Sequence, residues 1–225
     1  MAMEATSPEP ESEALVGSYG PEQSLLVASF LSLSGGFLDA YTWLSLGGVF
    51  ASSQTGNVVF FGMYAASGQW HQAAHHALPI LAFLAGALLA TRLRAPLLCL
   101  AGEIVCLGVM MVMLVLHCVA EPVAIVGIAF GAALQSASFR HVERWKYLSV
   151  TVTGNMLRAI DQFAAMPRSE ATRGGPAMLT LCLMFLLGAA AGGWVTMRFE
   201  AVSLVLPIAS STYVLGLCRR RCRRN

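Results

Sequence analysis

Charged side chains inside long apolar stretches are the first residues that could carry chemistry in this chain. Asp39 is the clearest of them, because it is the only Asp, Glu, Lys or Arg among residues 23–91. A central Asp, Lys or Arg costs about 2.5–3.5 kcal/mol on membrane-insertion scales. Asp39 could therefore bind a cation or a proton, act as an acid or base, or be satisfied structurally by a neighbouring helix or a membrane surface.

Three other charged residues in apolar surroundings have structural interpretations. Glu103 lies seven residues after Pro96, which favours a position at a membrane interface. Arg158 and Asp161 are three residues apart, so on a helix they can pair with each other. Glu103 is also kept as a possible acid or base.

A short motif, Thr-Gly-Asn, occurs at residues 55–57 and again at residues 153–155. Thr and Asn favour helix starts, because their side chains accept hydrogen bonds from backbone N–H groups that lack partners there. A helix that begins at Gly56 or Gly154 would direct these N–H groups toward the preceding polar residues. Such helix ends occur inside membranes where they line a cavity, but ordinary caps at the membrane surface account for the motif equally well.

The segments around this motif indicate an internal duplication. Three pairs of segments match in the same order: 35–39 with 131–135, 53–57 with 151–155, and 83–86 with 185–188. Their shifts are 96, 98 and 102 residues, as expected of a duplicated unit with small loop insertions. The units are residues 25–118 and 122–218. Four crossings per unit would make them parallel, whereas three crossings and one non-crossing segment would invert them.

The polar residues of both units are predicted to form one site for a solute or an ion. The predicted set is Asp39, Thr55, Asn57, Gln135, Thr153 and Asn155. The duplication matches Asp39 with Gln135 and Asn57 with Asn155, and clustering would let these groups satisfy one another, water or a ligand. We expect these two pairs to converge on one cavity at bilayer depth, with Asp39 as its single titratable group.

The composition shows which elements must position these residues. Of the 225 residues, 56% are hydrophobic and 12% are charged, whereas soluble domains carry about a quarter charged residues. This excludes a soluble globular enzyme and predicts an all-α polytopic bundle of transmembrane helices. Apolar segments are expected at residues 24–50, 56–70, 77–94, 97–118, 122–139, 147–165, 176–197 and 201–218.

The ends of the chain differ from this membrane domain. Residues 1–23 are predicted to be a disordered acidic tail, residues 24–218 the membrane domain, and residues 219–225 an Arg-rich tail. The charges favour an outside N-terminus and an inside C-terminus, which requires an odd number of crossings. Seven crossings result if segment 147–165 does not cross, and eight if all segments do, so we expect seven or eight embedded segments.

No catalytic or nucleotide-binding motif occurs, so we predict no cofactor, no metal and no enzymatic reaction. His71 and His75 are four residues apart, but without an acidic or Cys partner they are interpreted as interfacial. The scattered basic residues do not favour a nucleic-acid partner. The expected partners are the lipid bilayer and a small solute or ion. Homo-oligomers could form through the Gly-xxx-Gly pairs, Gly127/Gly131 and Gly188/Gly192.

One family resemblance follows from these motifs. The chain resembles the YoaK family of uncharacterised multi-pass membrane proteins over about residues 25–218. The segments that carry the resemblance are 35–40, 46–50, 55–57, 131–135 and 151–155. It implies an integral membrane protein without an established substrate.

The function that we predict is that of a transporter or permease-like protein for a small solute, located in the plasma membrane rather than an internal membrane. The duplicated unit, the paired Thr-Gly-Asn motifs and Asp39 favour it. One alternative is a non-transporting membrane scaffold or sensor. A less favoured one is an intramembrane enzyme that uses Asp39 or Glu103 as its acid or base.

Overall fold

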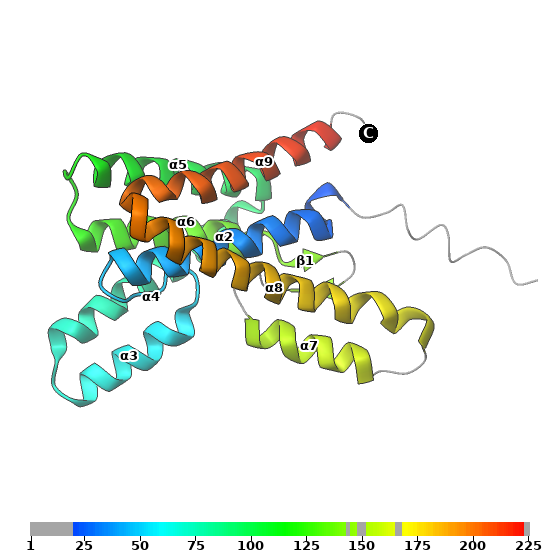
Figure 1. Ribbon diagram of the computed structural model, residues 1–225, viewed down its shortest axis with the longest axis horizontal. Helices are drawn as coiled ribbons and strands as arrows, with labels where there is room; N and C mark the ends of the chain where they lie inside the picture. Colours follow the sequence, from blue (N-terminus) through cyan, green and yellow to red (C-terminus); the bar gives the residue numbers. More distant parts are fainter. Residues whose placement is uncertain (1–19, 143–144, 148–151, 165–167, 223–225) are drawn as a thin grey trace, which may run out of the picture.

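The protein is an all-α helical bundle with one small β-hairpin (Figure 1). The structure is a computed structural model that describes residues 20–142, 145–147, 152–164 and 168–222. Its elements are η2 (Pro21–Gln23), α2 (Leu25–Ser45), α3 (Gln54–Ala66), α4 (Trp70–Leu93), α5 (Pro96–Val115), α6 (Glu121–Ser138), β1 (His141–Val142), β2 (Trp145–Lys146), α7 (Val152–Ala164), α8 (Arg168–Phe199), η3 (Glu200–Leu204) and α9 (Val205–Cys222). Strands β1 and β2 pair in antiparallel fashion, with Val142 opposite Trp145.

Among the described residues, five helical stretches are long and apolar enough to cross a membrane: α2, α4, α5, α6 and the stretch Gly174–Arg220, which includes most of α8 and α9. Their length fits the roughly 20 residues that a bilayer core requires. Large apolar side chains such as Leu81, Val105 and Leu186 are more than 60% exposed on the outside of the bundle, where lipid would cover them. The chain is therefore an integral membrane protein.

Helices α3 and α7 are too short to cross. Each has 13 residues, which gives a length of about 20 Å at 1.5 Å per residue, against about 30 Å of hydrocarbon. They occupy the predicted segments 56–70 and 147–165, and they begin at Gln54 and Val152 rather than at Gly56 and Gly154.

The structure describes the predicted tails at the two ends of the chain only in part. Residues 1–19 of the predicted acidic tail lie outside the described residues. Helix α9 continues to Cys222, so the predicted Arg-rich tail begins as part of a helix.

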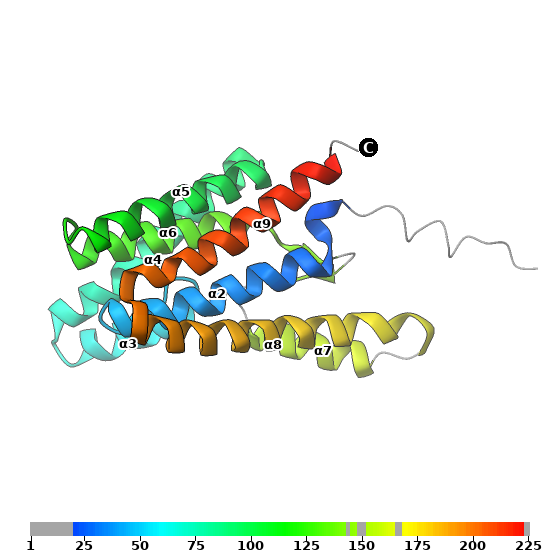
Figure 2. The same cartoon turned by 45° about the horizontal axis from the view of Figure 1, so that its top comes forward.

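The long helices lie side by side along one axis of the molecule (Figures 1 and 2). In Figure 1, α2, α5 and α8 run from right to left, and α4, α6 and α9 run back, so the start of α2 and the end of α9 lie at the same end. Helix α3 runs from the middle of the molecule toward the left end, whereas α7 runs from the middle toward the right end.

The two most extensive helix pairs are α2 with α8 and α4 with α6. In the first pair, glycines bring the two helix backbones close together. A Cβ atom added to Gly36 would lie 2.0 Å from the carbonyl oxygen of Phe185, and one added to Gly188 would lie 2.0 Å from that of Leu33. Glycine at these positions lets the α2 and α8 backbones touch.

The predicted Gly-xxx-Gly pairs pack against other helices of the same chain. Gly188 and Gly192 face α2, while Gly127 and Gly131 face Met110 and Cys106 of α5. An oligomer would therefore need a different surface.

Two buried apolar clusters form the core around α2, α5, α6 and α9. The first core cluster includes Phe37, Leu38, Leu107, Ile128, Ala132 and Leu204, with Ile208 packed against it. The second core cluster includes Val27, Leu31, Leu100, Phe139 and Val214. Helices α2 and α5 contribute to both clusters, so residues between their cluster members lie between the two clusters.

Candidate functional site

The loop at residues 46–53 joins α2 to α3 and brings the start of α3 next to Asp39 of α2. Gly47 and Gly48 have φ values of 65° and 78°, the left-handed conformation that glycine adopts without strain, and the chain reverses there. Asp39 is 4% exposed. Its Oδ1 accepts hydrogen bonds from the backbone N–H groups of Ser52, at 2.7 Å, and Ser53, at 3.3 Å. A carboxyl group of α2 thus supplies an acceptor to the backbone just before α3, where helix geometry leaves N–H groups without helical partners.

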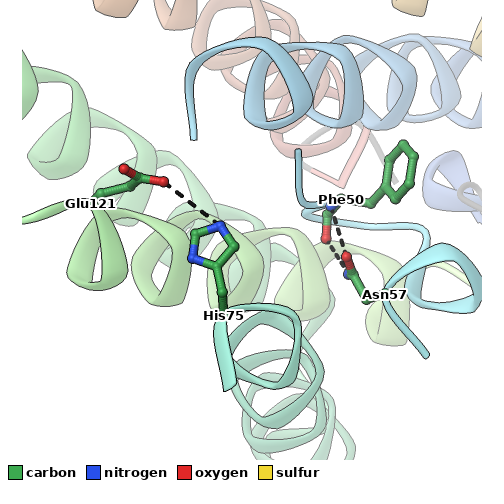
Figure 3. A network of polar contacts seen from close by, with 4 residues as sticks. All are labelled: Phe50, Asn57, His75 and Glu121. Carbon is green, nitrogen blue, oxygen red and sulfur yellow. Dashed lines mark hydrogen bonds and ion pairs between the residues drawn. The ribbon is translucent and has the colours of Figure 1, made fainter. Parts of the chain in front are cut away.

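Asn57 holds the same loop from the other side, and it is completely buried. Figure 3 shows its side chain against the backbone of Phe50: Oδ1 accepts from the Phe50 N–H at 3.0 Å, and Nδ2 donates to the Phe50 carbonyl oxygen at 2.7 Å. Nδ2 also donates to Gln54 Oε1 at 2.8 Å. The Asn of the Thr-Gly-Asn motif therefore works by fastening the preceding loop to the first turn of α3.

One hydroxyl group, that of Thr42, completes the loop site, which we define as the loop 46–53 with Asp39, Thr42 and Asn57. Thr42 Oγ1 accepts from the Ala51 N–H at 3.1 Å and donates to the Leu38 carbonyl oxygen at 3.0 Å. Irregular backbone at membrane depth is tolerated where the protein satisfies its polar groups, and these bonds do so. Asp39 Oδ2, by contrast, has no hydrogen-bond partner among the described residues.

Thr55 does not belong to this network. Its side chain is exposed, as is that of Thr153 at the start of α7. Asn155 is 2% exposed, and its Oδ1 accepts from Arg158 Nη1 at 3.5 Å. The loop that precedes α7, residues 148–151, lies outside the described residues.

The predicted ion pair between Arg158 and Asp161 is wrong. Arg158 reaches back to Asn155 instead, and the Asp161 side chain is exposed to the surroundings of α7. On a helix, Asp161 and Asn155 are both three positions from Arg158, on opposite sides along the chain. Arg158 donates to the amide oxygen of the buried Asn155.

Gln135 contacts α2 and not the loop site. It is 2% exposed, and its Nε2 donates to the Leu31 carbonyl oxygen at 3.2 Å. Leu31 precedes Asp39 by eight residues, which is about 12 Å along a helix. The structure therefore brings Asp39 and Asn57 to one loop and sets Gln135 against the same helix two turns away. Convergence of both pairs on one cavity stays a prediction.

Glu103 is the buried charged residue whose surroundings sequence reasoning missed. It was expected at an interface, yet its side chain is completely buried. Glu103 Oε2 accepts a hydrogen bond from Ser211 Oγ of α9 at 3.0 Å, and Oε1 has no partner among the described residues. Seven residues separate Glu103 from Pro96, so the side chain lies two helical turns inside α5. No local signal in the sequence pairs Glu103 with Ser211, because the two residues are 108 positions apart.

The histidines join helices. His75 Nε2 of α4 lies 3.7 Å from Glu121 Oε1 of α6 (Figure 3), and Gly47 sits against this pair, since an added Cβ would lie 2.5 Å from His75 Nε2. His76 is buried and stacks on Phe60 of α3, with ring centroids 5.0 Å apart. No group of three metal-ligating side chains occurs among the residues that the structure describes.

These features define a class: a helical integral membrane protein in which a short helix starts from a loop held by hydrogen bonds to buried side chains. Residues 27–217 match the family described as "Protein of unknown function (DUF1275)", and the chain belongs to this family. No curated protein matches the chain, and no solved structure matches it.

Proposed function

We propose that the protein is a transporter or permease-like protein for a small solute. The observation that carries the proposal is α3, a 13-residue helix whose start is held by a buried carboxyl group, Asp39, from a neighbouring membrane-spanning helix. Interrupted helices of this kind, with irregular backbone before a helix N-terminus, frame the binding sites of several transporter folds. The positive end of the α3 dipole and the unpartnered Asp39 Oδ2 would face a bound polar solute or ion.

The proposal includes two inverted repeats, α2–α5 and α6–α9. The packing supports this because equivalent helices make equivalent contacts. The first helix of each repeat packs on the third helix of the other repeat, α2 on α8 and α6 on α4. Within each repeat the short helix packs on the third helix, α3 on α4 and α7 on α8. Each repeat has three long helices and one short one, and α3 and α7 point toward opposite ends of the molecule (Figure 1). An odd number of crossings per repeat inverts the second repeat relative to the first.

This arrangement has six crossings and places both ends of the chain on the same side of the membrane. It replaces the seven crossings that the charges favour and the eight that result if all predicted segments cross, because α3 and α7 are too short to span. A tag fused at Met1 and a tag fused at Asn225 are then expected to have the same accessibility in intact cells. Opposite accessibility would contradict the six-crossing arrangement.

The proposed solute site lies between the starts of α3 and α7. Asp39 and Asn57 would line it from the first repeat, and Gln135 and Asn155 from the second. The exposed Thr55 and Thr153 would contribute at its edge, since each occupies the first turn of its short helix.

The test is solute flux in liposomes that contain the purified full-length protein, with a panel of small solutes and a proton-sensitive dye. Asp39→Asn keeps the shape of the side chain and is expected to reduce flux at least tenfold. Asp161→Asn is the matched control, because Asp161 is exposed on α7, and it is expected to leave flux unchanged. Equal flux in wild type and Asp39→Asn would assign Asp39 a structural role only.

A scaffold or sensor without transport is the second candidate. It is favoured by the number of hydrogen bonds with which Asp39, Thr42 and Asn57 fasten the loop, since a purely structural role would require the same bonds. Absence of flux across the whole panel, from folded protein, would select it. Turnover of a solute without flux would select the intramembrane enzyme instead. The plasma-membrane location and the narrower resemblance to YoaK-like proteins also stay predictions.

A further inference from the structure

A polar layer crosses the bundle between its two apolar clusters. The layer consists of Ser34 on α2, Glu103 on α5, Gln135 on α6 and Ser211 on α9, none of which is more than 2% exposed. Along the chain, each of these residues lies between a residue of the second core cluster and a residue that belongs to the first core cluster or packs against it. The pairs are Leu31 and Leu38 around Ser34, Leu100 and Leu107 around Glu103, Phe139 and Ala132 around Gln135, and Val214 and Ile208 around Ser211. Four helices thus each place one buried polar group between apolar core residues along the helix.

Three contacts show that the helices are close together at this level. Ser211 Oγ donates to Glu103 Oε2 at 3.0 Å, which joins α9 to α5. Gln135 Nε2 donates to the Leu31 carbonyl oxygen at 3.2 Å, which joins α6 to α2. A Cβ atom added to Gly131 would lie 3.7 Å from Glu103 Cα, so α6 also reaches α5 at Glu103. No space for bulk solvent is left at Glu103, whose side chain is completely buried.

The hydrogen bonds of the layer are incomplete in a particular way. Among the described residues, Glu103 Oε1 and Ser34 Oγ have no hydrogen-bond partner. An ionised carboxylate offers only acceptors, and here it would receive a single hydrogen bond, from Ser211, with no described cation beside it. A protonated carboxyl group still accepts the Ser211 hydrogen bond and carries no uncompensated charge at this buried position.

The titratable groups on the surrounding helices do not supply a counter-charge. Cys106, one turn along α5, is the group that interacts electrostatically with Glu103. Asp39 of α2 lies in the loop site, beyond Leu38 of the first core cluster. Arg219 and Arg220 are exposed at the far end of α9, and α6 contributes the uncharged Gly131 and Gln135 to this region.

We propose that Glu103 is a proton-binding site that the closed polar layer keeps occupied. When the helices separate and water enters the layer, the Oε1–H bond breaks, its electron pair stays on the carboxylate, and the proton passes to a water molecule as hydronium. Closing the layer reverses the transfer. Ser211 acts as a positioning residue that orients the carboxyl group through Oε2.

This site stands without the proposed transport function. If the protein does carry a solute, a proton on Glu103 is the ion to which solute movement would be coupled, and that part alone rests on the proposed function. The site differs from the loop site, since Glu103 contacts Ser211 and not α3 or its loop.

Infrared difference spectroscopy of the full-length protein in lipid nanodiscs tests the proposal without any measurement of flux. A change from low to high pH is expected to remove a carbonyl stretching band of a protonated carboxylic acid and to create carboxylate bands. Deuterium oxide should shift that carbonyl band. The band is expected to be absent in Glu103→Gln and retained in Glu121→Gln, because Glu121 is exposed at the start of α6. Asp39→Asn identifies any contribution from the other buried acid.

Ser211→Ala provides a second variant if Glu103→Gln does not fold. Removing the hydroxyl donor to Oε2 is expected to shift the Glu103 carbonyl band to higher frequency without abolishing it. The proposal is overturned if no protonated-acid band depends on Glu103 at any pH, or if Ser211→Ala leaves the band unmoved. It is also overturned if sodium ions at constant pH remove the band, because the carboxylate then binds a cation.

Discussion

The loop site and the polar layer each bury a carboxyl group among membrane-spanning helices, but they surround it differently. Asp39 receives two backbone N–H groups from the segment that begins α3, so it holds a chain reversal in place. Glu103 receives one hydroxyl group from a distant helix, and in both carboxyl groups the second oxygen has no partner among the described residues. Backbone donors tie a carboxyl group to the shape of the fold, whereas a single side-chain donor leaves it free to gain or lose a proton.

Breaking the loop site at Asn57 is expected to have the largest effect on stability. Asn57→Ala removes the side chain that pairs with both backbone groups of Phe50, and each buried group left unpaired costs about 1–3 kcal/mol. The free energy of unfolding in detergent should fall by about 3 kcal/mol. Thr55→Ala, on the same turn but exposed, is the control and should change it by less than about 0.5 kcal/mol. Equal effects would show that the loop does not depend on Asn57.

The next largest effect is expected at Gly47, which ties the loop to α4 and α6. Both Gly47 and Gly48 are left-handed, so alanine at either costs about 1 kcal/mol in backbone strain. At Gly47 the added Cβ also meets His75 Nε2 at 2.5 Å, whereas at Gly48 its nearest neighbour is a Trp43 ring atom at 3.7 Å. Gly47→Ala should therefore lower the free energy of unfolding by about 2 kcal/mol and Gly48→Ala by about 1 kcal/mol. Equal losses would mean that the His75–Glu121 pair moves aside at no cost.

A smaller loss is expected when the loop carboxyl group is neutralised. Asp39→Asn keeps one side-chain oxygen for the Ser52 N–H but makes the hydrogen bond weaker, since bonds to charged acceptors are about twice as strong as neutral ones. The expected loss is about 1–2 kcal/mol in the free energy of unfolding. Asp161→Asn, exposed on α7, should change it by less than about 0.5 kcal/mol. A stability gain in Asp39→Asn would mean that Asp39 does not support the loop as described.

The smallest effect is expected in the polar layer. If Glu103 carries a proton, Glu103→Gln replaces one neutral side chain by another of the same shape, and Ser211 can still donate to the amide oxygen. The free energy of unfolding should change by less than about 1 kcal/mol. Glu103→Ala should cost clearly more, because it leaves a cavity and an unpaired Ser211 hydroxyl. A loss in Glu103→Gln as large as that in Glu103→Ala would argue against a neutral Glu103.

The amino-acid sequence by itself determined the class of protein and the positions of the helices. A composition of 56% hydrophobic and 12% charged residues permits only a membrane bundle, and the apolar segments lie where the long helices form. The Thr-Gly-Asn motif also marked the starts of both short helices to within two residues. These features are local, because helix starts and apolar runs depend on neighbouring residues along the chain.

Only the tertiary structure decided which partner each buried polar group has. Asp39 bonds to residues 13 and 14 positions away, and Glu103 bonds to Ser211, 108 positions away. Local rules placed Glu103 at an interface and paired Arg158 with Asp161, because the chain alone does not show which helices pack together. That packing is set by backbone contact at residues such as Gly36 and Gly188, and it brings distant polar groups to one level of the bundle.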